Sequence, residues 1–326
     1  MLIQSNCIHG FFEQNVVHMK VLVTGGAGFI ASHIVDAYVE RGHAVTVVDN
    51  LSSGQRENVN RRAELIVADL RDPKTAEMLR GRRFDILNHH AAQIDVRVSV
   101  ADPAADAELN IVATLRLVQS LVTSGVTKIV FASSGGAIYG DPVHVPQSEE
   151  HPTAPISPYG CAKLAIDQYL HYYRVVHGVP SVSLRYGNVY GPRQRKDGEA
   201  GVVAIFAGAM LEGQQPRING SGEQTRDYVF VEDVVHANMA ATELDLTGPY
   251  NVGTGIETSV NGLYAALCKV IGITKPAEHA PAKPGEQMRS VLDASRLWNA
   301  AKLQPPVPLS DGLRQTVDWM RSVSVR

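Results

Sequence analysis

Short apolar runs alternate with longer amphipathic stretches through the first half of the chain. The first run, Lys20–Thr24, is rich in β-branched residues and ends in glycines, which is typical of a buried parallel strand. A helical pattern follows it as far as about Arg41, and the alternation then repeats. We predict further strands at 44–49, 64–69, 84–88, 128–132 and 181–186, and helices near 73–80, 103–123 and 157–177.

Strands that alternate with helices over short connections predict a parallel sheet with helices on both faces. The second half of the chain is less regular, because turn clusters such as 219–222 and the proline-rich run 305–308 interrupt it. We therefore expect an α/β fold with a doubly wound parallel sheet and a smaller C-terminal α/β domain. Such sheets bind ligands at the carboxyl ends of their strands, and the candidate chemistry of this chain gathers at those positions.

Composition excludes several classes of protein. The 326 residues carry 30 Lys and Arg against 33 Asp and Glu, which argues against a basic surface for nucleic acid or for an anionic membrane. The three cysteines are far apart and odd in number, so we expect neither a disulfide framework nor a metal site, and a cytoplasmic location is the default. His89 and His90 would point to opposite faces of a strand and do not predict a metal pair. The sequence contains no run of about 18 apolar residues, so we predict no membrane-spanning helix.

A glycine-rich turn follows the first predicted strand. Gly26, Gly28 and Ala31 match the dinucleotide-binding pattern G-x-G-x-x-G/A, and Gly25 adds an overlapping glycine. These glycines allow a tight turn and let a pyrophosphate approach the backbone, while the start of the next helix faces the anion. The motif is weak alone, but here it lies between a predicted strand and a predicted helix. It predicts a Rossmann-type sheet that binds a dinucleotide.

Asp49 ends the second predicted strand, 21 residues after Gly28. A carboxylate at this position accepts hydrogen bonds from the adenosine ribose and repels a 2′-phosphate, so NAD is favoured over NADP. A plain loop-capping role for Asp49 is the alternative. Asp69 ends the third predicted strand and is placed by the same geometry to contact the adenine.

Tyr159 and Lys163 are four residues apart and share one face of a predicted helix. This spacing often arises by chance, and a surface aromatic beside a solvated lysine is the ordinary interpretation. Here it follows the dinucleotide motif and a strand-end serine, Ser134, which lies 25 residues before Tyr159. A phenol with a pKa of about 10 is a poor base at neutral pH, but a lysine ammonium and an oxidised nicotinamide both favour the phenolate. The serine hydroxyl can hydrogen-bond a substrate oxygen while the tyrosine exchanges its proton.

With these motifs the chain resembles the extended short-chain dehydrogenase/reductase family, and within it the nucleotide-sugar epimerases. The resemblance covers nearly everything from Met19 to the C-terminus, and it also rests on the segments 90–93, 185–192, 226–229 and 251–253. It implies that Tyr159 is the acid/base, that Lys163 lowers its pKa and holds the nicotinamide ribose, and that Ser134 shares the proton network. It adds to the cofactor site the residues Phe29, Ile30, Asn50, Leu70, Ala91, Ala92 and Gln93.

For the substrate, the resemblance implies a UDP-sugar whose diphosphate is held by cations and backbone N–H groups. Lys283 stands where relatives usually carry arginine and lacks the planar fork of that residue. Ser290 stands where a bulky tyrosine restricts the pocket to plain hexoses, so N-acetylated sugars are expected to be tolerated. A solvated surface charge is the alternative for each charged residue. The candidates are Asn188, Arg226, Lys283, Glu286, Arg289 and Ser290.

The resemblance implies an NAD-dependent 4-epimerase that interconverts UDP-glucose and UDP-galactose by reversible hydride transfer through a 4-keto sugar. A UDP-N-acetylglucosamine or UDP-glucuronate 4-epimerase shares the same catalytic residues and stays open. Gly135 and Gly136 stand where 4,6-dehydratases carry an Asp-Glu pair, which argues against a dehydratase. A non-catalytic NAD-sensing protein on the same fold is the alternative of another class, and the intact Ser134, Tyr159 and Lys163 count against it.

These assignments predict the organisation of the chain. Residues 19–186 and about 228–255 form the NAD-binding domain, about 187–227 and 256–326 form the substrate domain, and 1–18 are an N-terminal extension. The resemblance further implies a homodimer formed through the helices near 103–123 and 157–177. Simple packing of these helices on the sheet is the alternative.

Overall fold

The computed structural model describes residues 18–196, 201–282 and 287–324 of the chain. Its largest element is a seven-stranded sheet in which every pair of neighbouring strands is parallel. The predicted Rossmann-type, doubly wound sheet is confirmed, and its strand order reverses between β1 and β4. In spatial order the strands are β10 (Gly248–Val252), β6 (Ser181–Tyr186), β5 (Lys128–Ser134), β4 (Ile86–His89), β1 (Lys20–Thr24), β2 (Ala44–Asp49) and β3 (Glu64–Val67).

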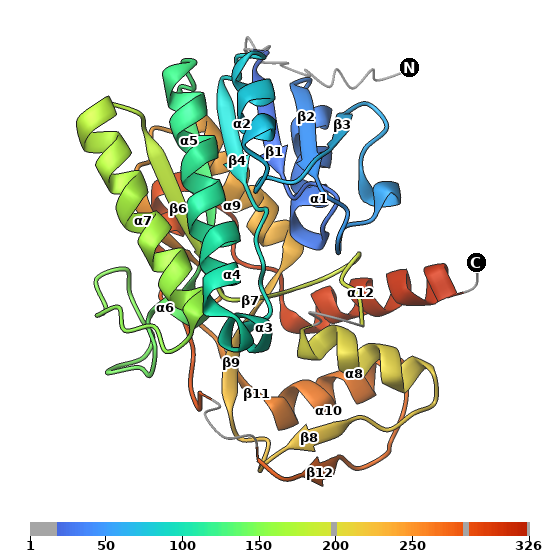
Figure 1. The fold of residues 1–326 in the computed structure, drawn as a ribbon. Helices are drawn as coiled ribbons and strands as arrows, with labels where there is room; N and C mark the ends of the chain where they lie inside the picture. The colour runs from blue at the N-terminus through green and yellow to red at the C-terminus, as the bar shows by residue number, and fades with distance from the viewer. Residues whose placement is uncertain (1–17, 197–200, 283–286, 325–326) are drawn as a thin grey trace, which may run out of the picture.

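Helices cover both faces of this sheet (Figure 1). On one face lie α2 (Pro73–Arg80), α5 (Thr114–Thr123) and α7 (Pro158–His177), and on the other lie α1 (Phe29–Glu40) and α9 (Val231–Glu243). Successive residues of β1 point to opposite faces, so Leu22 is buried under the first set of helices while Val21 and Val23 are buried under the second. This burial on both sides explains why the strands read as continuous apolar runs.

The predicted helix at 103–123 consists of three pieces. α4 (Pro103–Ala107) is followed by a π-helical segment, η2 (Glu108–Ala113), which leads into α5. Within the wider turn, Asn110 is buried and its side-chain amide donates to the Asp106 carboxylate and to the carbonyl of Gln93. The other short helices of this half are η1 (Arg56–Asn58), α3 (Val96–Ala101) and α6 (Gly135–Ile138).

The second half of the chain is more regular than its sequence pattern suggests. Its helices α8 (Val202–Leu211), α10 (Val260–Ile271) and α12 (Leu309–Ser324) enclose a separate apolar core that includes Phe206, Leu263 and Val317. Figure 1 shows α8 and α10 beyond the carboxyl ends of the large sheet. The accompanying small sheets are β11-β9-β7, formed by Glu257–Ser259, Thr225–Phe230 and Asn188–Tyr190, and β12-β8, formed by Glu278–Ala280 and Arg217–Asn219; α11 spans Ser295–Ala301.

The chain crosses between the two regions more than once. It leaves the large sheet after β6, forms β7, and returns through α9, which packs on α1, to β10, which pairs with β6. Two contacts join α1 to the segment after β7: the carbonyl of Pro192 lies 2.9 Å from His33 Nε2, and Arg193 forms an ion pair with Asp36 at 2.7 Å. These crossings fix the small sheets next to the carboxyl edge of the large one.

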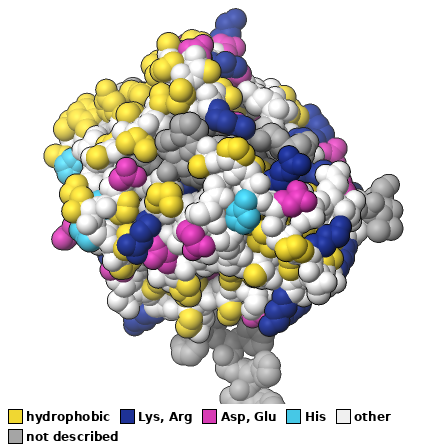
Figure 2. Space-filling view, turned by 90° about the horizontal axis from the view of Figure 1, so that it is seen from below, with side chains coloured by type: hydrophobic (Ala, Val, Ile, Leu, Met, Phe, Trp, Pro, Cys, Tyr) yellow, Lys and Arg dark blue, Asp and Glu magenta, His cyan; other side chains and the backbone are white. Residues whose placement is uncertain are grey.

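The surface of the second region carries a mixture of side chains. Figure 2, which views the molecule from below, shows basic and acidic groups interspersed with apolar ones on this face. Among the described residues, no helix is both long enough and apolar enough to cross a membrane.

Candidate functional site

The glycine-rich turn after β1 brings two backbones into close contact. Gly25 has a φ of +70°, and a Cβ atom on it would lie 2.8 Å from the backbone nitrogen of Ala91, which follows β4. Gly28 precedes the first turn of α1, which begins with Phe29 and Ile30. Close packing therefore requires glycine at position 25, and the backbone N–H groups at the start of α1 suit the binding of a pyrophosphate.

Asp49 is buried at the end of β2, and both of its carboxylate oxygens accept backbone hydrogen bonds. Oδ2 accepts from Ala27 in the glycine turn at 3.0 Å, and Oδ1 accepts from Leu51 at 2.8 Å. The loop-capping role and a ribose-binding role are thus compatible, since each carboxylate oxygen has more than one acceptor site. The carboxylate also fixes the turn that would hold the dinucleotide.

Asp69 and Asn50 lie together at the same edge. Arg71 forms an ion pair with the Asp69 carboxylate at 2.7 Å, and the Asn50 side-chain amide donates to it at 3.1 Å. Arg71, and to a lesser degree Asn50, hold the pKa of Asp69 well below its usual range. Leu70, next to Asp69, is buried in the core beneath them.

The histidines at the end of β4 are structural. His89 Nδ1 lies 2.7 Å from Thr24 Oγ1 and its Nε2 lies 2.9 Å from Thr114 Oγ1, while His90 Nε2 lies 3.0 Å from the hydroxyl of Tyr186. Burial lowers the pKa of both histidines to about 3, so they are neutral at physiological pH. Within the described part of the chain, no group of three or more His, Cys, Asp or Glu could hold a metal.

The segment that follows these histidines, Ala91 to Gln93, is also fixed in place. The Gln93 side-chain amide donates to Asp106 at 3.0 Å, and its backbone N–H donates to Asn110 at 2.9 Å. The π-helical segment η2 therefore supports the loop at the carboxyl end of β4. The backbone of Ala91 lies directly against Gly25 of the glycine turn.

Ser134 is the last residue of β5, and its register partner on β6 is Tyr186. The two residues after it form the start of α6 and differ in their surroundings. A Cβ on Gly135 would lie 2.5 Å from the side chain of Leu292, whereas a Cβ on Gly136 would meet nothing within 4 Å. A larger residue at 135 would have to displace the end of the Leu292 side chain, whereas position 136 has room for one, and neither glycine has a side chain that could donate a proton.

Tyr159 and Lys163 are brought to this edge by the close approach of α7 to α6. The Ser157 hydroxyl caps α7 by accepting from the Gly160 N–H at 3.1 Å, and a Cβ on Gly160 would lie only 2.5 Å from the Ala137 carbonyl. The Lys163 ammonium lies 5.7 Å from the centre of the Tyr159 ring. The tyrosine ring is thereby held beside a cation at the end of β5.

The ammonium of Lys163 is buried, and it donates to the carbonyl of Ala132 at 2.8 Å. It also lies 4.8 Å from the centre of the Phe131 ring. Burial lowers the pKa of Lys163 to about 8, and the carboxylates of Asp167 and Asp106 oppose this effect. A cation in this position stabilises negative charge on a neighbouring oxygen more strongly than one in water would.

The residues predicted to bind substrate lie on and beside the three-stranded sheet. Asn188 is exposed on β7, and Arg226 on β9 donates to the carbonyl of Thr225 at 2.7 Å. Ser290 is buried, while Arg289 lies on the surface. Lys283 and Glu286 lie outside the described residues.

Arg289 has a partner that the sequence motifs did not indicate. Its Nε and Nη2 donate to the two carboxylate oxygens of Glu257 at 2.6 and 2.8 Å, and Thr225 Oγ1 also donates to Glu257. The arginine and threonine hold the pKa of Glu257 low, at about 2. β11 runs antiparallel to β9 and places Glu257 opposite Asp227, the residue that follows Arg226.

Comparisons with known proteins identify the family of this chain. Residues 21–253 match the model of the NAD dependent epimerase/dehydratase family. The solved UDP-glucose 4-epimerase of Thermotoga maritima, in complex with UDP-glucose, is 44% identical, with a TM-score of 0.92 over 94% of this chain and 100% of that one. The UDP-glucose 4-epimerase of Thermus thermophilus, in complex with NAD, is also 44% identical, with a TM-score of 0.86 over 93% and 99% of the two chains.

A third relative differs in the sugar that its name specifies. The UDP-N-acetylglucosamine 4-epimerase of Methanobrevibacter ruminantium, in complex with UDP-N-acetylmuramic acid, is 35% identical, with a TM-score of 0.89 over 94% and 99% of the two chains. The family match and these identities show that the chain belongs to the NAD dependent epimerase/dehydratase family.

The burial of Lys163 makes a testable contribution to stability. Because its pKa is about 8 in the folded protein and about 10.5 when unfolded, the unfolded chain binds more protons between these values, and stability rises with pH across this window. Below pH 8 the buried charge costs roughly 3 kcal/mol. Lys163→Met is therefore expected to be more stable than wild type at pH 7 by an amount of that order.

Urea denaturation of the two proteins from pH 7 to 10.5, without added nucleotide, measures this difference. The stability difference should shrink as pH rises through the window, because other titrating groups are common to both proteins. A variant less stable than wild type throughout, with a gap independent of pH, contradicts the assignment.

Proposed function

We propose that this chain is an NAD-dependent UDP-sugar 4-epimerase that interconverts UDP-glucose and UDP-galactose. The observation that carries the proposal is the position of Lys163, a buried ammonium beside the Tyr159 ring at the carboxyl end of β5. This pair lies at the same sheet edge as the glycine turn after β1. The two relatives named UDP-glucose 4-epimerase, each 44% identical, support this choice of substrate.

NAD fits the residues present, and we propose that it stays bound through the cycle. Gly25, Gly26 and Gly28 would accept its pyrophosphate, while Asp49 would hold the adenosine ribose. The remaining candidate contacts line the same edge: Phe29, Ile30, Asn50, Asp69, Leu70, Ala91, Ala92 and Gln93, together with Tyr159 and Lys163. NAD, when bound, supplies an acceptor for the hydride of the sugar C4 and returns it.

The catalytic roles follow from proton and charge positions. Tyr159 takes the proton of the 4-hydroxyl as the C4 hydride leaves, which gives a 4-keto sugar, and it returns the proton to O4 when hydride is delivered to the other face. Lys163 stabilises the negative charge on the tyrosine oxygen during this exchange. Ser134, at the end of β5, would hydrogen-bond the same sugar oxygen.

The substrate would be held mainly by its diphosphate. Arg226 lies on β9, Arg289 is paired with Glu257 of β11, and guanidinium groups suit phosphate oxygens. Asn188 would contribute a further hydrogen bond. Lys283 and Glu286 stay candidates by position in the sequence. The glycines after Ser134 supply no acid or base for water elimination, which favours epimerisation over dehydration.

We further propose the setting in which the enzyme works. The large sheet with its helices, residues 19–186 and about 228–255, serves as the NAD-binding domain, and 187–227 with 256–326 serves as the substrate domain. The three scattered cysteines and the near-neutral charge suit a cytoplasmic enzyme without nucleic-acid or membrane partners. Of the two helices expected to form a homodimer, α7 exposes apolar residues, as does the neighbouring α3, whereas 103–123 exposes no large apolar side chain.

Tyr159→Phe removes the proposed proton acceptor while retaining the ring. Because acid/base catalysis of this kind contributes about 100-fold or more, the variant is expected to lose at least that factor in kcat. Epimer separation after incubation with UDP-galactose, without added NAD, measures the loss, and Tyr169→Phe on the exposed face of α7 is the matched control. Absence of epimerisation by wild type on a full panel of UDP-sugars would favour an NAD sensor instead.

The size of residue 290 is expected to set which sugars are accepted. Wild type, with the small Ser290, should turn over UDP-N-acetylgalactosamine as well as UDP-galactose, as the name of the 35% identical relative suggests. Ser290→Tyr should lower kcat/KM for the acetylated sugar by about 10-fold or more and change that for UDP-galactose less. Parallel assays of both sugars test this, and no activity of wild type on the acetylated sugar would refute it.

The exposed stripe on α7 predicts the state of association. Tyr169, Tyr172 and Val176 recur on one side of the helix and are 44%, 44% and 62% exposed, and α3 beside it exposes Val98. Burial of this stripe against a second copy removes apolar surface from water. Light scattering is expected to give twice the 35.2 kDa chain mass, and Val176→Glu should shift it toward the monomer. A monomeric wild type would exclude the dimer.

A further inference from the structure

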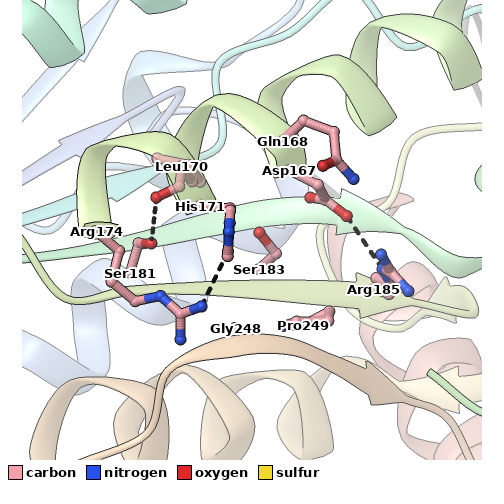
Figure 3. A pocket seen from close by; sticks show the side chains of 10 residues that line it. All are labelled: Asp167, Gln168, Leu170, His171, Arg174, Ser181, Ser183, Arg185, Gly248 and Pro249. Atoms are coloured by element: carbon pink, nitrogen blue, oxygen red, sulfur yellow. Dashed lines mark hydrogen bonds and ion pairs between the residues drawn. The ribbon is translucent and has the colours of Figure 1, made fainter. Parts of the chain in front are cut away.

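A buried ion pair lies directly behind the proposed site. Asp167 of α7 accepts from Arg185 Nε of β6 at 3.1 Å, and their side chains are 5% and 6% exposed. Figure 3 shows the two groups facing each other across the gap between the helix and the strand. Nothing in the reaction proposed above uses either residue. A buried pair costs desolvation that its own attraction only partly offsets, so its presence requires another reason.

Asp167 and Lys163 occupy the same buried face of α7. They are four residues apart, which is one helical turn, and both side chains point toward the large sheet: Lys163 reaches the carbonyl of Ala132 on β5, and Asp167 reaches Arg185 on β6. The helix thus places a carboxylate one turn beyond a lysine that is buried and charged. The buried charges of Lys163, Asp167 and Arg185 are therefore positive, negative and positive in turn.

The other groups that face Lys163 offer less support to its charge. His89, at the end of β4, and His90, which follows it, are both neutral. Asp106 on α4 is a second carboxylate that favours the protonated lysine, but Asp167 contributes more. Asp106 is engaged by two side-chain amides, those of Gln93 and Asn110.

We propose that Asp167 keeps Lys163 in its ammonium form during the reaction, and that it acts as a positioning residue for proton exchange at Tyr159. If residue 167 were neutral, only Asp106 would oppose the effect of burial on the Lys163 ammonium. The lysine would then lose its proton near neutral pH, and the tyrosine oxygen would lose its cation. This inference rests on the proposed role of Lys163 in epimerisation.

Arg185 in turn stabilises the ionised form of Asp167. Burial raises the pKa of Asp167 above its usual value, and the Arg185 guanidinium offsets part of this rise, as do the hydroxyls of Ser183 and Ser133. Arg185 is itself fixed from the other side, since its Nη1 donates to the hydroxyl of Tyr139 at 3.0 Å, and that hydroxyl donates to Asn251 at 2.7 Å. The anion next to Lys163 is therefore anchored by a chain of contacts that reaches β10.

The pair also borders a cavity, which makes substitution at 167 feasible. The cavity has a volume of about 190 Å³ and lies between α7, β6 and β10, with Asp167, Ser183 and Arg185 in its wall (Figure 3). A side chain that changes charge or adds one methylene can adjust into this space. Asp167→Asn and Asp167→Glu are thus the informative variants.

The direct test is an NMR titration of the Lys163 side chain in the full-length protein, with and without NAD. The 13Cε resonance is assigned by its absence in Lys163→Met. Asp167→Asn is expected to move the titration midpoint to lower pH by about 1 or more, because a nearby opposite charge shifts a pKa by that order. Asp167→Glu should restore the wild-type midpoint.

Arg185→Lys is the matched control, because it disturbs the same contacts but retains the positive charge. It is expected to leave the midpoint of Lys163 nearly unchanged. An unchanged midpoint in Asp167→Asn, or an equal displacement in Arg185→Lys, overturns the proposal and assigns the pair a packing role. If Asp167→Asn does not fold, the double variant Asp167→Glu with Asp106→Asn is titrated instead. A Lys163 midpoint near that of wild type supports the role of Asp167. A midpoint about 1 pH unit lower assigns the role to Asp106.

The pH profile of kcat tests independently whether Asp167 controls the protonation of Lys163. Since the protonated lysine is the active form, the alkaline limb of the profile should move to lower pH in Asp167→Asn by the same amount as the NMR midpoint, with KM for UDP-galactose little changed. A uniform loss of kcat without movement of the limb contradicts the proposal. A protein that shows the NMR displacement but no epimerisation would instead refute the proposed function alone.

Discussion

The ammonium group of Lys163 is the constraint around which the site is organised. A charge in the interior is costly, and the pKa of this lysine falls to about 8 because of it. The neighbouring elements offset the cost in part, through the carbonyl of Ala132 at the end of β5 and the carboxylates of Asp167 and Asp106. A solvated lysine would be less costly to the fold but would stabilise a phenolate far less. The buried charge thus lowers the stability of the fold, but it provides the electrostatic environment that proton transfer at Tyr159 needs.

The parallel sheet gives this lysine its partners. Because the strands all run one way, the ends of β1, β4, β5 and β6 meet at one edge, where the glycine turn, the neutral histidines and Ser134 come together. The contact of Thr24 with His89 joins the ends of β1 and β4, and that of His90 with Tyr186 joins the ends of β4 and β6. Such cross-strand contacts fix the spacing between a dinucleotide and the reacting groups, on which hydride transfer depends.

Much of this could be predicted from the sequence where one local pattern decides the outcome. The strands at 20–24, 44–49 and 181–186 and the helix at 73–80 are confirmed, because continuous apolar runs and the caps around them leave few alternatives. β4 covers 86–89 rather than 84–88, since its pairing with β1 and β5 decides its ends. The π-helical break after Ala107 depends on the contacts of Asn110 with the β4 loop, which no helical periodicity encodes.

The residues of the site also fall into those that a local motif predicts and those that only the fold brings together. The glycine turn and the Tyr159–Lys163 spacing are local motifs, so the sequence indicated them. The partners that tune them are distant in the chain: Asp167 finds Arg185 on another strand, and Arg289 finds Glu257, 32 residues away. An acid one turn after a buried lysine is a usable signal for the first pair. To predict the pair of Arg289 and Glu257, one must know the antiparallel register of β11 and β9. Strands this short have too little sequence pattern to predict that register.

The central claim is that one hydride leaves C4 of the sugar and returns to the same carbon while the cofactor stays bound. The most direct measurement uses UDP-galactose that carries deuterium at C4, incubated with the purified protein in ordinary water, with NMR and mass analysis of the product. We expect UDP-glucose that keeps the deuterium at C4, without exchange into solvent and without added NAD. Replacement of that deuterium by a solvent proton would contradict it, because the C4 hydrogen would then leave as a proton.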